Sequence, residues 1–196
     1  NTDGVYVGGN CIDTGDCSGP KSARSVLLHP DVDAAVLETA RGGVLREGLA
    51  FDRCDVAVVT NVGAGDHLGL NYITTVQELA VLKRVIVQNV ASTGVAVLNA
   101  ADPSVAVMAS KCRGSVTFFA LDKHHPVMAT HRAQGQAVVY VEDGHIVAAK
   151  GNMVQKIALN DIPLTLGGAI GFQVENAMAS IAAVWALGVD WDIIRH

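Results

Sequence analysis

Residues 56–62 read VAVVTNV, and the glycine-rich stretch GAGDHLG follows at once at residues 63–69. A short apolar run that ends at turn-forming residues is typical of a strand buried on both faces. Residues 74–90, TTVQELAVLKRVIVQNV, then place most apolar side chains on one helical face, and residues 95–100, VAVLNA, repeat the strand pattern. This order of strand, helix and strand predicts a βαβ unit and a parallel sheet.

The flanking segments continue the same pattern. Residues 34–39, AAVLET, form another continuous apolar run and predict a buried strand, and residues 115–120, SVTFFA, predict a further one. Thr74 or Thr75 is suited to cap the helix at 74–90, with Glu78 near its third position. Further helices are expected at residues 22–29, from Pro103 to about Cys112, and at 172–188.

Two hairpins are predicted from glycine turns. Residues 5–12, VYVGGNCI, alternate around two glycines, and residues 137–151 carry the turn pair Asp143-Gly144 between apolar runs. The second hairpin belongs to an antiparallel insertion at about 121–168 beside the parallel core. The fold class is therefore α/β, with a three-layer, mostly parallel sheet and an antiparallel hairpin appendage, in one domain over residues 1–196.

Composition excludes several classes of protein. Half of the 196 residues are apolar and 17% are charged, so the chain is globular and not disordered. The net charge is −5 without a run of Lys or Arg, which argues against a nucleic-acid or membrane partner. The four cysteines lack zinc-type spacing and no apolar run has transmembrane length, which favours reduced thiols in the cytoplasm over the disulfides of an exported protein.

Polar residues follow three of the predicted strands. Ligands of open parallel sheets gather at the carboxyl ends of strands, so these positions are candidates for a site. They are Glu38 and Thr39, Thr60 through His67, and Asn99 through Asp102.

Each candidate also has a plain structural interpretation. Glu38 at the end of a buried strand either binds a metal or forms an ion pair with Arg41 or Arg46. Asn99 and Asp102, taken alone, are explained by ordinary turn chemistry. His67 is equally compatible with a surface histidine and Asp66 with a helix cap, and spacing alone makes Lys83 a lysine whose stem lies along the helix surface.

Four stretches of the sequence resemble the central domain of the Mur-type amide ligases. These are TNVGAGDHLG at 60–69, ETARGG at 38–43, NAADP at 99–103, and GFQVENAMASIAA at 171–183. Members of that family couple ATP hydrolysis to the joining of an amine to a carboxylate. The resemblance implies a three-layer fold like that of the phosphate-loop NTPases.

The resemblance also implies roles for individual residues. Glu38 and His67 match family residues that bind Mg²⁺, and Asp66 would orient the ring of His67. Lys83 matches a lysine that becomes carbamylated and assists a second metal. Asn176 matches an asparagine that contacts adenine, while Phe172-Gln173 stands where the family has His-Asn, which leaves the role of that position open.

The remaining candidates are assigned by their place beside these residues. Asn61, Asn99, Asp102 and Gln173 are assigned to ATP binding together with Asn176. Thr39 and Arg41, which follow Glu38, are assigned to substrate binding. We expect Glu38 and His67 to lie at neighbouring strand ends, close enough to share one Mg²⁺.

Residues 2–27, 38–62 and 161–168 go further and resemble a polymer-forming branch of the family, whose members add arginine to aspartate side chains of a polyaspartate chain. This resemblance implies ATP and arginine as small-molecule substrates and an aspartate polymer as acceptor. No GxxxxGK[ST] phosphate loop is present in these residues, although the family places one just before this position. The chain starts without Met and stops within a helical pattern, so we expect a piece of a longer ligase that is inactive when excised and depends on upstream and C-terminal domains.

Other functions remain open at this point. A Mur or folylpolyglutamate-type ligase with another acceptor would use the same ATP chemistry. A non-catalytic scaffold domain of a polymerising enzyme and a plain nucleotide-binding switch are alternatives from other classes. A homo-oligomer is compatible with the sequence.

Overall fold

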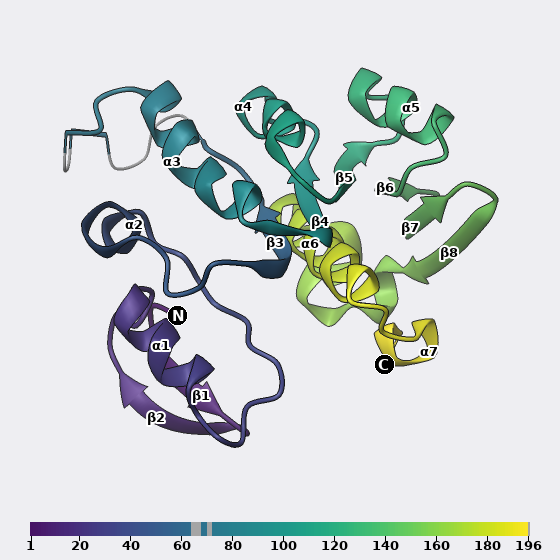
Figure 1. The fold of residues 1–196 in the computed structure, drawn as a ribbon. Helices are drawn as coiled ribbons and strands as arrows, with labels where there is room; N and C mark the ends of the chain where they lie inside the picture. The colour runs from purple at the N-terminus through teal and green to yellow at the C-terminus, as the bar shows by residue number, and fades with distance from the viewer. Residues whose placement is uncertain (64–67, 70–71, 196) are drawn as a thin grey trace. The chain divides into compact units, whose positions relative to one another are not determined.

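A computed structural model describes residues 1–63, 68–69 and 72–195 (Figure 1). The chain divides into two compact units, each considered by itself. The first comprises Asn1–Asp52 and Gly69–Thr74, and the second comprises Arg53–Leu68 and Thr75–His196. The prediction of one domain over the whole chain is not tested by this division and stays a prediction.

The first unit is built on a hairpin. Strands β1 (Gly4–Val7) and β2 (Asn10–Thr14) pair in the antiparallel sense, as predicted for residues 5–12. Gly8 and Gly9 between them have φ values of +56° and +83°, and such a turn with two positive φ angles matches the twist of the strands it joins. Two helices complete the unit, α1 (Pro20–Leu27) and α2 (Arg41–Glu47).

The predicted buried strand at residues 34–39 is wrong. These residues form no strand, and the side chain of Val36 is fully exposed. An apolar run indicates only a preference for burial, whereas a strand also needs a neighbour whose backbone groups are free to pair with it. Among the described residues, the sheet of the first unit consists of β1 and β2, and residues 34–39 do not join it. The segment instead lines a pocket, described below.

The second unit contains a six-stranded sheet with the order β3-β4-β5-β6-β7-β8. Strands β3 to β6 are parallel, and β6, β7 and β8 are antiparallel, which confirms a mostly parallel sheet with an antiparallel hairpin. Because β6 pairs with β5, the hairpin extends the parallel sheet directly. The strands are β3 (Cys54–Val59), β4 (Val90–Asn99), β5 (Ser115–Asp122), β6 (Val138–Glu142), β7 (His145–Lys150) and β8 (Met153–Ala158).

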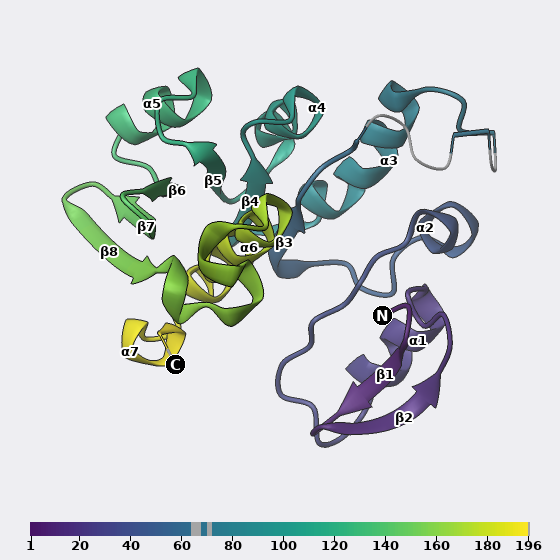
Figure 2. The same ribbon diagram turned by 180° about the vertical axis from the view of Figure 1, so that it is seen from behind.

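Helices cover both faces of this sheet, which confirms the three layers. The crossovers through α3, α4 and α5 join neighbouring parallel strands, and right-handed crossovers place all three helices on one face. Figures 1 and 2 show these helices on one side and α6 on the other. The helices are α3 (Val76–Gln88), α4 (Pro103–Ala106), α5 (Pro126–Ala133), α6 (Gly171–Ala186) and α7 (Trp191–Ile194), with 3₁₀ turns η1 (Val107–Lys111), η2 (Leu159–Asp161) and η3 (Pro163–Gly168).

Local sequence signals explain where two of these helices begin. Thr75 caps α3 by accepting a hydrogen bond from the N–H of Glu78, and the Glu78 carboxylate accepts one from the N–H of Thr75. This reciprocal pair is the predicted capping box. Pro103 opens α4 as predicted, but α4 gives way to the 3₁₀ turn η1 after Ala106.

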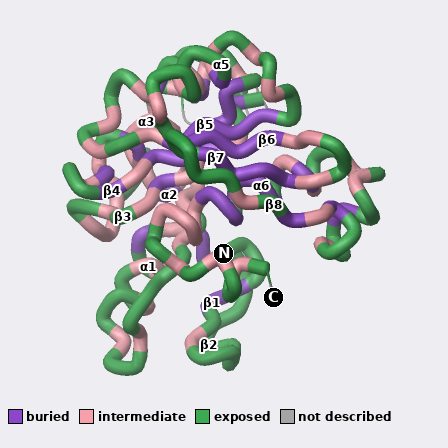
Figure 3. Tube along the Cα trace, turned by 90° about the vertical axis from the view of Figure 1, so that its right-hand side faces the viewer, coloured by how far each residue is buried: buried purple, intermediate pink, exposed green. Residues whose placement is uncertain are grey.

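The core of the second unit lies between the sheet and α6. Figure 3 shows its central strands as a buried band. Alternate residues of the strands, Val97, Phe119 and Val139 among them, pack against Met178 and Ala182 of α6, and all five are almost fully buried. The Ala-rich composition of α6 follows from this position, because small side chains let a helix lie close to a Val-rich sheet. Within the described residues, no helix is long and apolar enough to cross a membrane.

Candidate functional site

The carboxyl end of β3 is held by side chains from two other elements. Lys83 of α3 donates from Nζ to the carbonyl oxygen of Asn61 at 2.9 Å. Asp102, which follows β4, accepts at Oδ2 a hydrogen bond of 2.8 Å from the N–H of Val62. The structure therefore brings three of the predicted residues together at one edge of the sheet. Lys83 reaches this edge, so its charge does not simply extend into solvent from the helix surface.

Asp102 has a second set of partners. Its Oδ1 accepts hydrogen bonds from the N–H groups of Ser104 at 2.8 Å and Val105 at 3.3 Å, which caps the start of α4. Aspartate is well suited to this position because its carboxylate satisfies N–H groups that have no partner inside the helix. Both carboxylate oxygens are thus engaged by the backbone, as the turn interpretation of Asp102 expects.

Asn99 is also used by the fold. Its side chain is buried, its Oδ1 accepts from the N–H of Ala101 at 2.9 Å, and its Nδ2 donates to Oε1 of Glu175 at 3.4 Å. The bond to Glu175 fixes the first half of α6 against the end of β4. Glu175 carries no distinctive signal in the sequence, because it lies inside a helical pattern where a glutamate is ordinary.

The first turns of α6 carry the predicted adenine-contacting residues. Asn176 is exposed and donates from Nδ2 to Oε1 of Gln173 at 3.1 Å. This bond leaves the Asn176 carbonyl oxygen as an acceptor. Phe172 is 63% exposed and lies four positions before Asn176. Its ring and the Asn176 amide therefore lie on the same solvent-facing side of α6.

In the first unit, Glu38 lies in the extended segment before α2. Its side chain is exposed, and Oε2 accepts a hydrogen bond from the N–H of Thr2 at 3.0 Å. The expectation that Glu38 ends a buried strand fails with the strand itself. A water-exposed carboxylate carries no burial penalty, so the argument that it requires a metal or an ion pair no longer holds. The metal-binding role of Glu38 then depends on its resemblance to the family residue.

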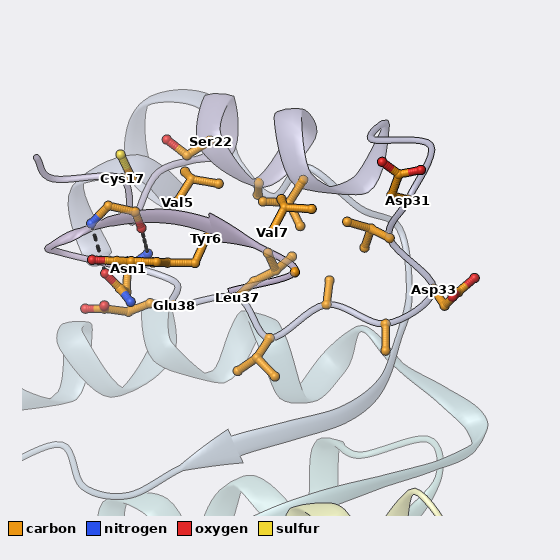
Figure 4. Close-up of a pocket in the computed structure, with 18 residues that line it drawn as sticks. Asn1, Val5, Tyr6, Val7, Cys17, Ser22, Asp31, Asp33, Leu37 and Glu38 are labelled. Atoms are coloured by element: carbon orange, nitrogen blue, oxygen red, sulfur yellow. Dashed lines mark hydrogen bonds between the residues drawn. The ribbon is translucent and has the colours of Figure 1, made fainter. Parts of the chain in front are cut away.

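Glu38 lines a pocket of about 220 Å³ in the first unit. The pocket lies among β1, α1 and residues 31–38, and Figure 4 shows Glu38 at one end of the lining and Asp31 and Asp33 at the other. Sites that bury most of a drug-sized ligand are roughly 300–1,000 Å³. This pocket is therefore too small to enclose a nucleotide by itself.

Thr39 and Arg41 follow Glu38 at the start of α2. Thr39 is half-buried in a small crevice between α1 and α2, and Arg41 is the first residue of α2. Gly43, the second of the two glycines after Arg41, has a packing role that no sequence motif indicated. A Cβ atom on buried Gly43 would lie 2.8 Å from Cδ of Pro20, so only glycine lets α2 approach the start of α1.

The pairing of Glu38 with His67 stays a prediction, because Asp66 and His67 lie outside the described residues. Among the residues that the structure does describe, no group of three or more His, Cys, Asp or Glu side chains is arranged to hold a metal ion. Mg²⁺ commonly takes only one or two protein carboxylates and completes its shell with water and phosphate oxygens. Glu38 could therefore be the one protein carboxylate of such a Mg²⁺ site.

A comparison of the sequence with known families agrees with this fold and with the polar residues at the carboxyl ends of β3 and β4. The sequence model of the Mur ligase middle domain family matches residues 2–184. The chain belongs to this family of ligase domains, as the four stretches of sequence indicated.

The curated relatives are more specific. The chain is 45% identical over 198 residues to a cyanophycin synthetase of Synechocystis sp. and 46% identical over 199 residues to one of Crocosphaera subtropica. Both matches cover 100% of this chain and 22% of the relative. A cyanophycin synthetase of Nostoc sp. is 41% identical over 195 residues. The chain thus spans about a fifth of the length of these synthetases.

Solved structures support the fold alone. A ligase from Acinetobacter baumannii that joins UDP-N-acetylmuramoylalanyl-D-glutamyl-2,6-diaminopimelate and D-alanyl-D-alanine matches 90% of this chain and 36% of its own, with a TM-score of 0.55 and 15% identity. A second structure, MurF from the same organism, has the same coverage and identity and a TM-score of 0.57. At this identity the likeness carries no information on individual site residues.

Proposed function

We propose that this chain is the nucleotide-handling middle domain of a cyanophycin-synthetase-type ligase. The γ-phosphate of ATP is transferred to an aspartate side-chain carboxylate of a polyaspartate chain, which gives an acyl phosphate and ADP. The α-amino group of arginine then attacks the acyl carbon, and an amide forms as phosphate leaves. The observation that carries this proposal is identity of 41–46% to cyanophycin synthetases along the whole chain.

Particular residues of the chain would serve this reaction. Glu38 and His67 match the family residues that bind Mg²⁺, and an ion bound there would supply positive charge to the transferring phosphoryl group. Lys83, at the carboxyl end of β3, matches the family lysine that becomes carbamylated, and in that form it would assist a second metal. The unmodified ammonium would instead place a cation beside the transferring phosphoryl group. Asn176, held by Gln173, offers an amide to the base, and Thr39 and Arg41 are assigned to the carboxylate substrate.

Several features support the proposal. Lys83 Nζ donates to the Asn61 carbonyl oxygen, and this hydrogen bond holds it at the carboxyl end of β3. Both Asp102 oxygens and the Asn99 side chain are engaged by the protein. The assignment of Asp102 and Asn99 to ATP binding stays a prediction, and their engaged side chains favour Asn61, Gln173 and Asn176 as the direct contacts. Use of ATP and reduced cysteines would be consistent with a cytoplasmic enzyme.

A chimera tests the proposal directly. The matching segment of the Synechocystis synthetase is replaced by these 196 residues, and ADP release is measured with and without arginine and an aspartate-containing acceptor polymer. We expect release that requires both substrates. The same chimera with Lys83→Met serves as the control and should lose most activity. A folded chimera that is inactive, or that accepts another amino acid in preference to arginine, would contradict the assignment.

A further inference from the structure

Lys83 and Asp102 bind the same peptide group. The carbonyl oxygen of Asn61 and the N–H of Val62 belong to the single peptide unit that joins these two residues, and they point in opposite directions across a trans bond. Lys83 Nζ is 2.9 Å from the oxygen, and Asp102 Oδ2 is 2.8 Å from the nitrogen. A cation from α3 and an anion from the loop after β4 thus hold the peptide from its two sides.

The charges suit the peptide dipole. An ammonium at the carbonyl oxygen and a carboxylate at the N–H each make a charge-assisted hydrogen bond, which is stronger than one between neutral groups. Each bond also polarises the peptide in the sense that strengthens the other. The side chain of Val62 is only 2% exposed, so its burial anchors the loop, while the two hydrogen bonds set the orientation of the peptide plane.

We propose that Asp102 is a positioning residue for the ligase reaction, and that it acts on Lys83 through the peptide between Asn61 and Val62. Asp102 itself contacts no substrate. It fixes the plane of this peptide, so the Asn61 carbonyl oxygen stays where it receives the Lys83 ammonium. This inference rests on the proposed function only where it assigns Lys83 a part in the reaction.

The helix-capping bonds of Asp102 can be separated from its bond to Val62. Asp102→Ser keeps an oxygen that can cap α4, because serine is a good N-cap residue, but its shorter side chain cannot also reach the Val62 N–H. Asp190 provides a matched control. It caps α7, which has four residues like α4, through a 2.8 Å bond from the N–H of Asp192 and takes no part in the site.

The first measurement is activity of the full-length protein that carries these residues. We expect Asp102→Ser to lower kcat by roughly 10- to 100-fold with little change in the KM for ATP, since misplacing a catalytic group costs rate more than binding. Asp190→Ser should retain wild-type kcat. In a Lys83→Met background, Asp102→Ser should cause little further loss, because it acts through Lys83. Equal kcat values for the two serine variants would overturn the proposal.

Two measurements do not depend on activity. In Asp102→Ser, hydrogen exchange at the Val62 amide should become about tenfold faster or more, the ratio expected for loss of a bond to a charged acceptor. Acylation of Lys83 by an amine-reactive ester, followed by mass spectrometry, should also become faster, while Asp190→Ser changes neither rate. Unchanged exchange and labelling in Asp102→Ser would refute the positioning role. If the wild type proved inactive, the proposed function would fail, and these two rates would still decide whether Asp102 positions Lys83.

Discussion

Asn99 and Glu175 are 76 positions apart in the sequence, and Asn99 Nδ2 donates to Glu175 Oε1 at 3.4 Å. Asn99 ends β4, and Glu175 lies in the first half of α6, so this bond ties α6 to the polar edge of the sheet. Gln173 and Asn176, which we assign to the nucleotide base, flank Glu175. The hydrogen bond between Asn99 and Glu175 therefore helps to set where the proposed base contacts of α6 lie relative to the carboxyl end of β4.

Replacement of this amide by a carboxylate should make stability depend on pH. In Asn99→Asp the introduced carboxyl group faces Glu175, and two carboxylates this close resist joint ionisation, so the pKa of the introduced group rises on folding. A group with a raised pKa in the folded state stabilises the fold least at high pH. We expect the melting temperature of Asn99→Asp to fall relative to wild type as pH rises from about 4 to 7.

A second substitution provides the control for this effect. Glu175→Gln in the Asn99→Asp protein removes the facing charge and restores an amide–carboxylate pair with the roles exchanged. The melting temperature should then recover at pH 7. A pH-independent loss in Asn99→Asp, unchanged by Glu175→Gln, would show that packing and not charge accounts for the effect.

Glu38→Gln should separate metal binding from stability. The Glu38 carboxylate is exposed and makes one hydrogen bond, to the Thr2 N–H, so its amide counterpart should change the free energy of unfolding by about 1 kcal/mol or less. Loss of a negatively charged oxygen ligand should instead raise the Mg²⁺ concentration needed for half-maximal ADP release by the full-length protein. Asp31→Asn, at the other end of the same pocket, is the matched control and should leave Mg²⁺ dependence unchanged. An unaltered Mg²⁺ requirement in Glu38→Gln would remove Glu38 from the metal site.

Most of the second unit could be predicted from local sequence. Its strands and helices carry strong patterns, such as the capping box at Thr75 and Glu78 and the turn at Asp143-Gly144, and each of these forms as predicted. Helix α5 was not predicted, because the polar and histidine-rich stretch before Pro126 carries no clear periodicity. The chain-long resemblance predicted the family correctly, since it rests on several motifs together.

Residues 34–39 show what local patterns do not contain. Their apolar run reports a preference for burial, but pairing depends on which strand is available beside them, and that is a property of the whole fold. The site has the same limit. The sequence indicated that Asp102 and Lys83 were of interest, but only the three-dimensional structure shows that they meet across one peptide group between Asn61 and Val62.

Gly114 should be intolerant of any side chain. A Cβ atom at this position would lie 2.2 Å from the carbonyl oxygen of Gly94, at the start of the parallel part of the sheet. Because that contact is with backbone, it cannot be relieved by a rotamer change, and we expect Gly114→Ala to lower the free energy of unfolding by about 3 kcal/mol. Gly171→Ala, at the first position of α6 with no atom within 4 Å of its Cβ, should be neutral or stabilising. Urea denaturation of both variants would test this, and similar unfolding free energies would contradict it.

The carboxyl end of β6 provides the last prediction. The Glu142 carboxylate accepts a hydrogen bond from Lys123 Nζ and lies 3.6 Å from Lys156 Nζ. The hydrogen bond from Lys123 lowers the pKa of Glu142 below its ordinary value near 4.5, and in return raises the pKa of Lys123 above 10.5. A lowered carboxyl pKa means that the unfolded chain binds more protons on acidification, so this contribution to stability is present above the unfolded pKa and is lost as pH falls through the folded pKa.

Glu142→Gln should therefore melt at a lower temperature than wild type between about pH 5 and 9. The melting temperatures of the two proteins should converge as pH falls below about 4. The difference should also shrink in high salt, because both partners are partly accessible to water. Asp192→Asn is the matched control, because Asp192 pairs with Arg195 at 3.0 Å but its side chain is 91% exposed, so the melting temperature should change little at any pH. A difference in melting temperature between wild type and Glu142→Gln that persisted unchanged to pH 3 would show that the substitution acts through packing and not through charge.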